Sequence, residues 1–325
     1  MEVMEAGSGE ITQCGQNPSS VSVIARRPLY LILAWCIFVA VAYIPNLAPK
    51  RSIDLAGLTI FWAFFSLTQI ILCDQAAIVM GHGSLLQYAT RNGRAWMRLL
   101  CTGALSGLLL DGLAQWLGKL WFYPYWNEAF YGATFVIGFC AYWLATCESY
   151  LLIHAILKRI RGERRSPAGL RFYENTLFRS LGLLGIALFT AAILLIAHDY
   201  RQAGGYVFEV RRQTPVRIHF SYFLAAFIGL WLILEWIQVA RGSLSLLRTI
   251  INGRLNPLLA LLVSSCIFSL FWETVNSAHH FWVYTNWPLR QWQLMHIPLT
   301  VLLTSLLQYV VFLSLGFLLG YDMWA

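Results

Sequence analysis

The sequence predicts an all-α protein that spans a membrane as a polytopic helical bundle, with about eight transmembrane helices in two parallel four-helix repeats. The first observation is the composition: 58% of the 325 residues are hydrophobic and 12% are charged, about half the charged fraction of a soluble domain. The second is that several apolar runs reach the roughly 20 residues needed to cross a bilayer. The third is a set of landmarks that recurs in both halves.

The elements follow from the apolar runs. Residues 1–25 are polar and show no apolar period, so we expect a disordered cytoplasmic tail and no cleavable signal peptide. The predicted spans are roughly 28–47, 55–79, 96–117, 130–157, 180–197, 219–240, 256–276 and 293–320. These spans give a first membrane repeat at 26–160, a basic cytoplasmic linker at 161–179 and a second membrane repeat at 180–325.

The charge distribution predicts the topology. A net charge of +8 would suggest a nucleic-acid partner for a soluble protein, but here the basic residues lie between apolar runs, where they set orientation. We therefore expect no nucleic-acid partner and a multi-pass protein of the cell membrane, the inner membrane if the source is bacterial, with both termini cytoplasmic. The connection 198–218 would lie outside and could form a short hairpin after Gly204 and Gly205.

The two halves repeat at a nearly constant distance. Asp111 and Glu273 are 162 residues apart, and Trp121 and Trp282 are 161 apart. Each of these acids lies at i+8 on an apolar helix that has small residues at i and i+4, and a W-x-Y-x-x-W loop follows each helix. Because four spans is an even number, both units would enter the membrane in the same orientation, related by an axis along the membrane normal.

Five carboxylates fall at membrane depth: Asp74, Asp111, Glu148, Glu235 and Glu273. Each costs at least about 2.5–3.5 kcal/mol at a helix centre, so an intramembrane acid is a functional-site candidate by default. Two of them lie on the stripes of small residues, which let helices approach closely. We therefore expect the third and seventh spans to meet and their two acids to face a shared space.

The candidate catalytic residues are Asp111 and Glu273. Two nearby carboxyl groups repel when both are ionised, so one is expected to stay protonated and to act as a proton donor beside a base. They could equally serve as polar anchors, or simply accept hydrogen bonds from their own loops and clamp the fold. The candidate substrate-binding residues are Gln115, Trp121, Tyr123, Glu148, Asn276, Trp282 and Tyr284.

Metal and cofactor chemistry is not indicated. The adjacent His279 and His280 lack the H-x-x-x-H or E-x-x-H spacing of a metal site, and none of the seven cysteines forms a C-x-x-C pair. We expect no cofactor and no metal, and the role of the two histidines stays open.

The second copy also carries a resemblance. Residues 271–276 read Phe-Trp-Glu-Thr-Val-Asn and residues 281–284 read Phe-Trp-Val-Tyr. This part of the chain resembles a family of bacterial polytopic membrane proteins with repeated W-E-x-x-N and W-x-Y signatures, whose function is unassigned. The first copy departs from the signature, with Asp111 in place of Glu and Gln115 near the Asn position. The resemblance implies a membrane fold and no catalytic roles.

Three functions fit these observations. The favoured one is a membrane protein that binds or converts an apolar substrate, a lipid or an isoprenoid, at the acid and aromatic site. The alternatives are a proton-coupled transporter or permease and a non-catalytic membrane scaffold. The expected partners are membrane lipids and an apolar small-molecule substrate. Whether the protein is an enzyme, and what its oligomeric state is, stay open.

Overall fold

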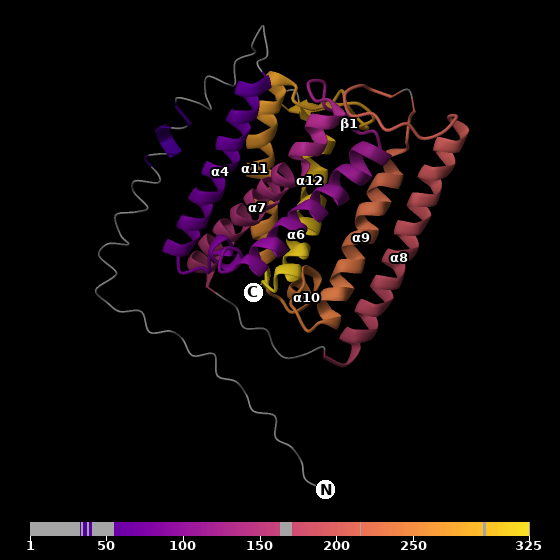
Figure 1. The fold of residues 1–325 in the computed structure, drawn as a ribbon. Helices are drawn as coiled ribbons and strands as arrows, with labels where there is room; N and C mark the ends of the chain where they lie inside the picture. Colours follow the sequence, from indigo (N-terminus) through magenta and orange to yellow (C-terminus); the bar gives the residue numbers. More distant parts are fainter. Residues whose placement is uncertain are drawn as a thin grey trace.

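The chain folds into a bundle of long helices (Figure 1). A computed structural model describes residues 55–162, 171–214, 216–294 and 297–324, together with residues 33, 35–37, 39 and 40. Within these residues, seven helical segments are long and apolar enough to cross a membrane. They are Thr59–Val79, Gly93–Leu117, Glu128–Arg161, Glu174–Gln202, Phe220–Ala240, Asn256–His279 and Leu299–Leu319.

Short helices and strands connect the long helices. The order is α4 (Leu55–Val79), α5 (Leu85–Ala89), α6 (Gly93–Asp111), the π-helix η3 (Gly112–Leu117), β1 (Trp121–Phe122), α7 (Glu128–Arg161), α8 (Arg171–Gln202), α9 (Phe220–Ala240), α10 (Leu246–Ile251), α11 (Asn256–His279), β2 (Val283–Tyr284), β3 (Gln293–Leu294), β4 (Ile297–Pro298), α12 (Leu299–Ser314) and the 3₁₀-helix η4 (Leu315–Leu319). The strand pairs lie at one end of the bundle, and α5 and α10 lie toward the other (Figure 1).

Seven of the eight expected spans correspond to these helices, and most of the first, 28–47, lies outside the described residues. Two boundaries and one connection differ from expectation. Helix α8 already begins at Arg171, so the second half of the expected linker is helical. The expected last span starts as the β3–β4 hairpin, and its helix begins only at Leu299. The described part of 203–218 holds no strand, so the hairpin expected there is absent from it.

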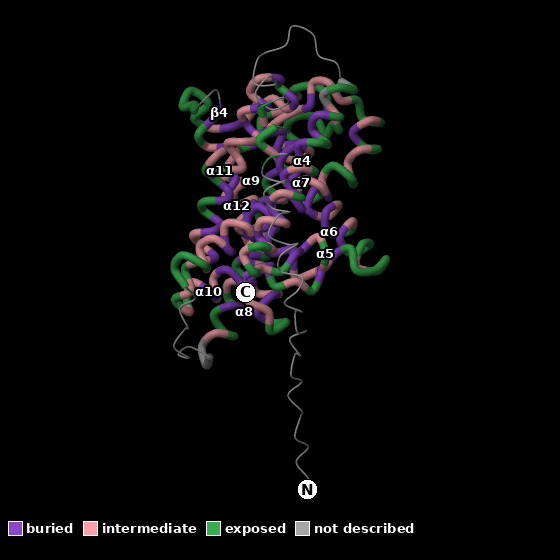
Figure 2. The backbone as a smooth tube through the Cα atoms, turned by 90° about the vertical axis from the view of Figure 1, so that its left-hand side faces the viewer, coloured by how far each residue is buried: buried purple, intermediate pink, exposed green. Residues whose placement is uncertain are grey.

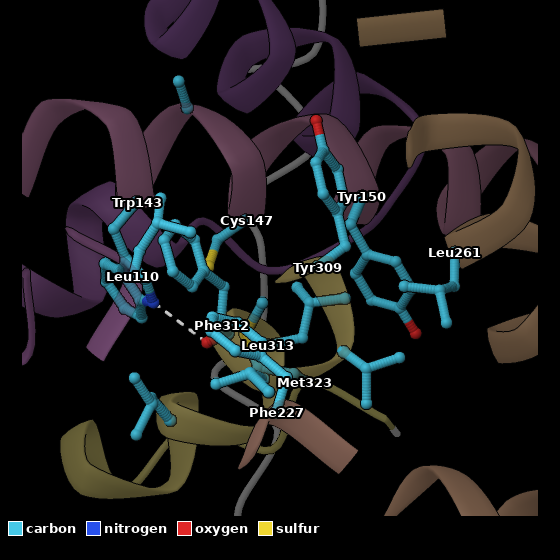
Figure 3. Packing of buried hydrophobic residues seen from close by; sticks show 14 of the residues in the cluster. Leu110, Trp143, Cys147, Tyr150, Phe227, Leu261, Tyr309, Phe312, Leu313 and Met323 are labelled. Carbon is cyan, nitrogen blue, oxygen red and sulfur yellow. Dashed lines mark hydrogen bonds between the residues drawn. The ribbon is translucent and has the colours of Figure 1, made fainter. Parts of the chain in front are cut away.

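The core lies around α7 and α12. Trp143 of α7 is fully buried and donates through Nε1 to the carbonyl of Phe312 in α12, 2.9 Å away (Figure 3). That bond is needed because a buried indole N–H without an acceptor is costly. Buried segments gather in the middle of the bundle, and exposed ones lie on its outside (Figure 2). Such exposed apolar surface fits a protein surrounded by lipid.

Helix α8 lies at the edge of the bundle beside α9 (Figure 1). The two helices approach closely at glycines: a Cβ added to Gly185 would lie 2.6 Å from the carbonyl oxygen of Gly229. Small residues permit this backbone contact, as is typical of helix pairs in membranes.

The stripe of small residues in α6 packs differently from our expectation. A Cβ added at Gly103 would overlap the backbone of Cys140 in α7, and one at Gly107 would overlap the ring of Phe139. The stripe therefore serves contact between α6 and α7, its neighbour after the β1 loop, rather than the expected contact between the third and seventh spans.

Candidate functional site: an acid and aromatic cavity

A cavity of about 380 Å³ lies among the helices near the strand-bearing end of the bundle. Its walls come from α4, α6, α7, α9, α11 and α12 and from both strands β1 and β2. Asp111 and Glu273 both line it. The two acids expected to face a shared space therefore face one cavity, although their helices are not brought together by the small-residue stripe.

Asp111 is the last residue of α6 and is completely buried. The hydroxyl of Tyr123 donates to it, 3.0 and 2.9 Å from its two carboxyl oxygens. The hydroxyl of Tyr131, from the first turns of α7, donates to Oδ2 at 2.7 Å. Each phenol is itself supported by an indole: Trp121 donates to Tyr123 at 3.1 Å and Trp116 to Tyr131 at 2.9 Å.

Glu273 in α11 has the same kind of support, with fewer strong donors. The hydroxyl of Tyr284 donates to Oε1 through a short hydrogen bond, and Trp282 Nε1 donates to that hydroxyl at 2.8 Å. The second oxygen, Oε2, receives Asn276 Nδ2 at 3.4 Å, the long end of the hydrogen-bond range. Asn276 in turn accepts the backbone N–H of Trp282 at 3.0 Å, which fixes the loop to the helix.

The two loops meet in a small antiparallel ladder. Strands β1 and β2 pair Trp121 with Tyr284 and Phe122 with Val283. A further backbone bond runs from Thr285 N to Leu120 O at 2.8 Å. This ladder covers the end of the cavity, and it holds the supporting indole of one acid beside the phenol of the other.

The cavity wall is aromatic and lacks cations. Trp62 stacks on Trp272 with ring centroids 4.9 Å apart, and Tyr123 stacks on Trp126 at 5.1 Å. Among the described residues that line the cavity there is no Lys, Arg or His. An apolar wall with a few polar groups is typical of a small-molecule site, and here both charged groups are acids.

The hydroxyl groups of the loop residues Tyr123 and Tyr284 stay protonated and therefore remain hydrogen-bond donors. Burial raises the pKa of both Tyr123 and Tyr284 well above the usual range, and the neighbouring carboxyl groups raise it further. Both hydroxyls therefore keep their protons at any physiological pH, and the hydrogen bonds to the acids persist.

The other residues expected at the site divide into two groups. Trp121, Tyr123, Trp282 and Tyr284 line the cavity, whereas Gln115, Asn276 and Glu148 are not among its lining residues. Gln115 is buried and donates to the carbonyl of Glu209 at 3.0 Å, where it ties η3 to the connection between α8 and α9. Asn276 contacts Glu273 from outside the cavity lining and holds the Trp282 backbone.

Glu148 lies toward the other end of α7. It accepts the backbone N–H of Leu86 in α5 at 3.0 Å, and its carboxyl group lies beside that of Asp74. Gln308, which is 160 residues after Glu148, instead lines the cavity and donates to the Tyr142 hydroxyl at 2.8 Å.

The adjacent histidines end a helix. His280 has φ +54°, and its backbone N–H donates to the carbonyl of Asn276 at 2.6 Å, which closes α11. His279 is buried. In the described residues, no group of three or more His, Cys, Asp or Glu side chains lies together as a metal site would require.

Sequence reasoning missed several residues of the site. Tyr131 donates to Asp111, and Tyr142, Trp272 and Gln308 line the cavity. A usable signal was present for Tyr131, which follows the capping residue Asn127 by four positions and therefore lies just inside the helix after the loop. The others required knowledge of which helices adjoin.

Fold and site together define a predominantly helical protein. The seven apolar helices within its described residues indicate a multi-pass membrane protein, with two acids and many aromatic rings around one cavity. No protein-family model matches the chain, and neither a curated protein nor a solved structure matches it significantly.

Proposed function

We propose that this protein is an integral protein of the cell membrane that binds or converts an apolar substrate, a lipid or an isoprenoid, in the cavity between Asp111 and Glu273. One observation carries the proposal: two intramembrane acids line a single cavity of about 380 Å³ whose other walls are largely aromatic. Buried acids are costly in a membrane and are typical of functional positions. An aromatic wall suits an apolar ligand.

The two acids have different roles in this proposal. Asp111 is held by two phenols, so its oxygens are largely occupied. Glu273 has one short hydrogen bond, from Tyr284, and weaker contacts from Asn276 and Trp282, so its Oε2 can accept a proton or a hydrogen bond from a ligand. Glu273 is therefore the proposed base or anchor, and Asp111 the second acid of a donor–base pair.

Two tandem repeats are part of the proposal. Under the 161-residue offset, Phe122 corresponds to Val283, and these two residues pair with each other in the β1–β2 ladder. A pair of equivalent residues at the centre of an antiparallel ladder is what a twofold axis through that point produces. The Trp–Tyr–acid chains also correspond. These contacts support two four-helix units related by an axis along the membrane normal.

The proposed orientation has both termini in the cytoplasm. The basic residues Lys158, Arg159 and Arg161 end α7 on the side away from the ladder, and Arg248 lies in α10 on that same side. An excess of Lys and Arg on one side predicts the cytoplasmic side.

Ligand retention tests the proposal. Protein purified in mild detergent or nanodiscs is examined by native mass spectrometry, and the wild type is expected to retain a lipid-sized apolar molecule. Asp111→Asn and Glu273→Gln should each reduce retention at least tenfold. Glu174→Gln is the matched control, because Glu174 pairs with Arg248 at 2.5 Å, outside the cavity lining. Wild-type retention in both site variants would reject the proposal.

A proton-coupled permease is the second candidate, because polar side chains continue from the cavity toward the other end. Trp272 Nε1 donates to Gln69 Oε1 at 2.9 Å, and Gln69 Nε2 donates to Ser149 Oγ at 2.8 Å. Glu148 and Asp74 lie beyond them. This candidate predicts flux driven by a pH gradient in proteoliposomes and its loss in Gln69→Leu. Ligand retention without any gradient-driven flux would favour the first candidate.

A further inference from the structure

The charge of the cavity restricts the head group of its ligand. Among the described lining residues, the carboxyl groups are those of Asp111 and Glu273, and no Lys, Arg or His joins them. An anion beside an ionised carboxyl group is repelled, more strongly where water is excluded than in bulk water. A phosphate, sulfate or carboxylate head group would meet this repulsion without a compensating cation.

The polar groups of the cavity favour a donor. Glu273 Oε2 receives the 3.4 Å contact from Asn276, and the indole of Trp282 is a third donor beside the carboxyl group. The other oxygen, Oε1, is occupied by the phenol of Tyr284. A carboxylate has about four acceptor sites, so one is left for a ligand. A head group that donates a hydrogen bond, such as a hydroxyl or a primary ammonium group, would complete the shell of Glu273.

The cavity also reaches the lipid-facing surface. Its lining includes exposed small or apolar residues of two helices: Ala63 in α4, and Ala133, Ile137 and Gly138 in α7. Ile137 is 72% exposed. At 1.5 Å per residue, positions 133–138 lie roughly 8–15 Å along α7 from its start, within the span. A Cβ added at Gly138 would meet no described atom within 4 Å, so this side is open.

We propose that the ligand is a membrane amphiphile with a hydrogen-bond-donating head group that carries no negative charge, and that its chain leaves the cavity between α4 and α7. The head group lies at Glu273 and the chain extends into the surrounding bilayer through the mouth formed by Ala63, Ala133, Ile137 and Gly138. This inference rests on the proposed ligand-binding function and specifies its substrate class.

The test uses three probes with one chain and different head groups. Dibromostearyl alcohol, dibromostearylamine and dibromostearyl phosphate are incorporated at equal mole fraction into phosphatidylcholine nanodiscs that hold the full chain. Bromine quenches tryptophan fluorescence on contact, and Trp62, Trp126 and Trp272 line the cavity. Saturable quenching, competed by the unbrominated chain-matched probe, reports the cavity, and non-saturable quenching reports the surrounding lipid.

Two glycine variants test the mouth. Gly138→Phe places a ring in the opening, and Gly132→Phe is the matched control, because a Cβ there also meets no described atom within 4 Å and Gly132 does not line the cavity. We expect saturable quenching by the alcohol and the amine, at least a tenfold weaker response to the phosphate, a loss of the saturable part in Gly138→Phe and its retention in Gly132→Phe.

The outcomes distinguish failure of the assigned head group and mouth from failure of ligand binding itself. Equal saturable quenching by the phosphate would overturn the assigned head group while leaving ligand binding intact. If Gly138→Phe shows unchanged saturable quenching and the same circular dichroism as the control, the proposed exit of the chain between α4 and α7 is wrong. Lack of saturable quenching by all three probes, together with no retained lipid, would overturn the proposed function itself.

Discussion

Replacement of Tyr284 by Phe removes one oxygen atom that serves two groups. The hydroxyl donates to Glu273 and accepts the Trp282 indole N–H at 2.8 Å. The ring can stay where it is, because Phe has the same shape, so the variant isolates the hydrogen bonds. Glu273 would keep the 3.4 Å contact of Asn276 and the nearby indole of Trp282, and would lose its short bond from a phenol.

The cost follows from the two groups left behind. A hydrogen bond to a charged group contributes about 1.5–3 kcal/mol, and a buried donor left without an acceptor costs about 1–3 kcal/mol. We therefore expect Tyr284→Phe to lower the free energy of unfolding by roughly 3 kcal/mol. Tyr123→Phe is the matched comparison. Tyr123→Phe also leaves the indole of Trp121 without its acceptor, but Asp111 keeps the 2.7 Å bond from Tyr131, so this second variant should cost less, about 2 kcal/mol.

Unfolding in mixed micelles with increasing sodium dodecyl sulfate, followed by far-ultraviolet circular dichroism, measures both variants on one scale. Wild type and the double variant complete the set and show whether the two acids are coupled. A Tyr123→Phe cost equal to or larger than that of Tyr284→Phe would refute the reasoning, because it would mean that the strength of the remaining hydrogen bonds does not decide the stability of the acids.

Two further predictions concern packing and pH. Gly185→Ala should lower the melting temperature by several degrees, because the added Cβ would lie 2.6 Å from the carbonyl oxygen of Gly229. Gly132→Ala is the control and should leave the melting temperature unchanged, because the space around Gly132 is open. Equal melting temperatures of the two variants would contradict the close packing of α8 on α9. Lys119 donates to Val207 O, and burial lowers its pKa to about 8. The unfolded chain then binds more protons between that pKa and about 10.5, so the stability of wild type relative to Lys119→Met should rise with pH in that window, by at most about 1.4 kcal/mol per pH unit. Melting curves of both proteins at pH 7.5 and 9.5 check this, and a fall over this interval would contradict it.

The helices could be predicted from sequence because their signal is local. Apolar runs of the length of a bilayer gave the expected spans at 55–79 and 219–240, which are nearly the same as α4 and α9. Boundaries failed where the signal was mixed. The charged segment before 180 was assigned to a linker, yet α8 begins at Arg171, since polar residues can continue a helix beyond the apolar part.

The site could be predicted in part for the same reason. Asp111, Tyr123, Glu273 and Tyr284 recur at one spacing, and this recurrence needs no tertiary information. Which helix packs on the small-residue stripe is not local, and α7 rather than α11 lies against Gly103. Glu148 illustrates the same limit, because its place beside Asp74 depends on how α7 crosses α4.

The β1–β2 ladder has a mechanical consequence. Tyr284, which holds Glu273, pairs with Trp121, and the indole of Trp121 holds Tyr123, which holds Asp111. A ligand that displaces Tyr284 from Glu273 therefore also displaces Trp121, whose indole supports Tyr123 at Asp111. Although each strand has only two residues, the ladder couples opposite walls of the cavity, so a ligand bound at Glu273 also changes the surroundings of Asp111.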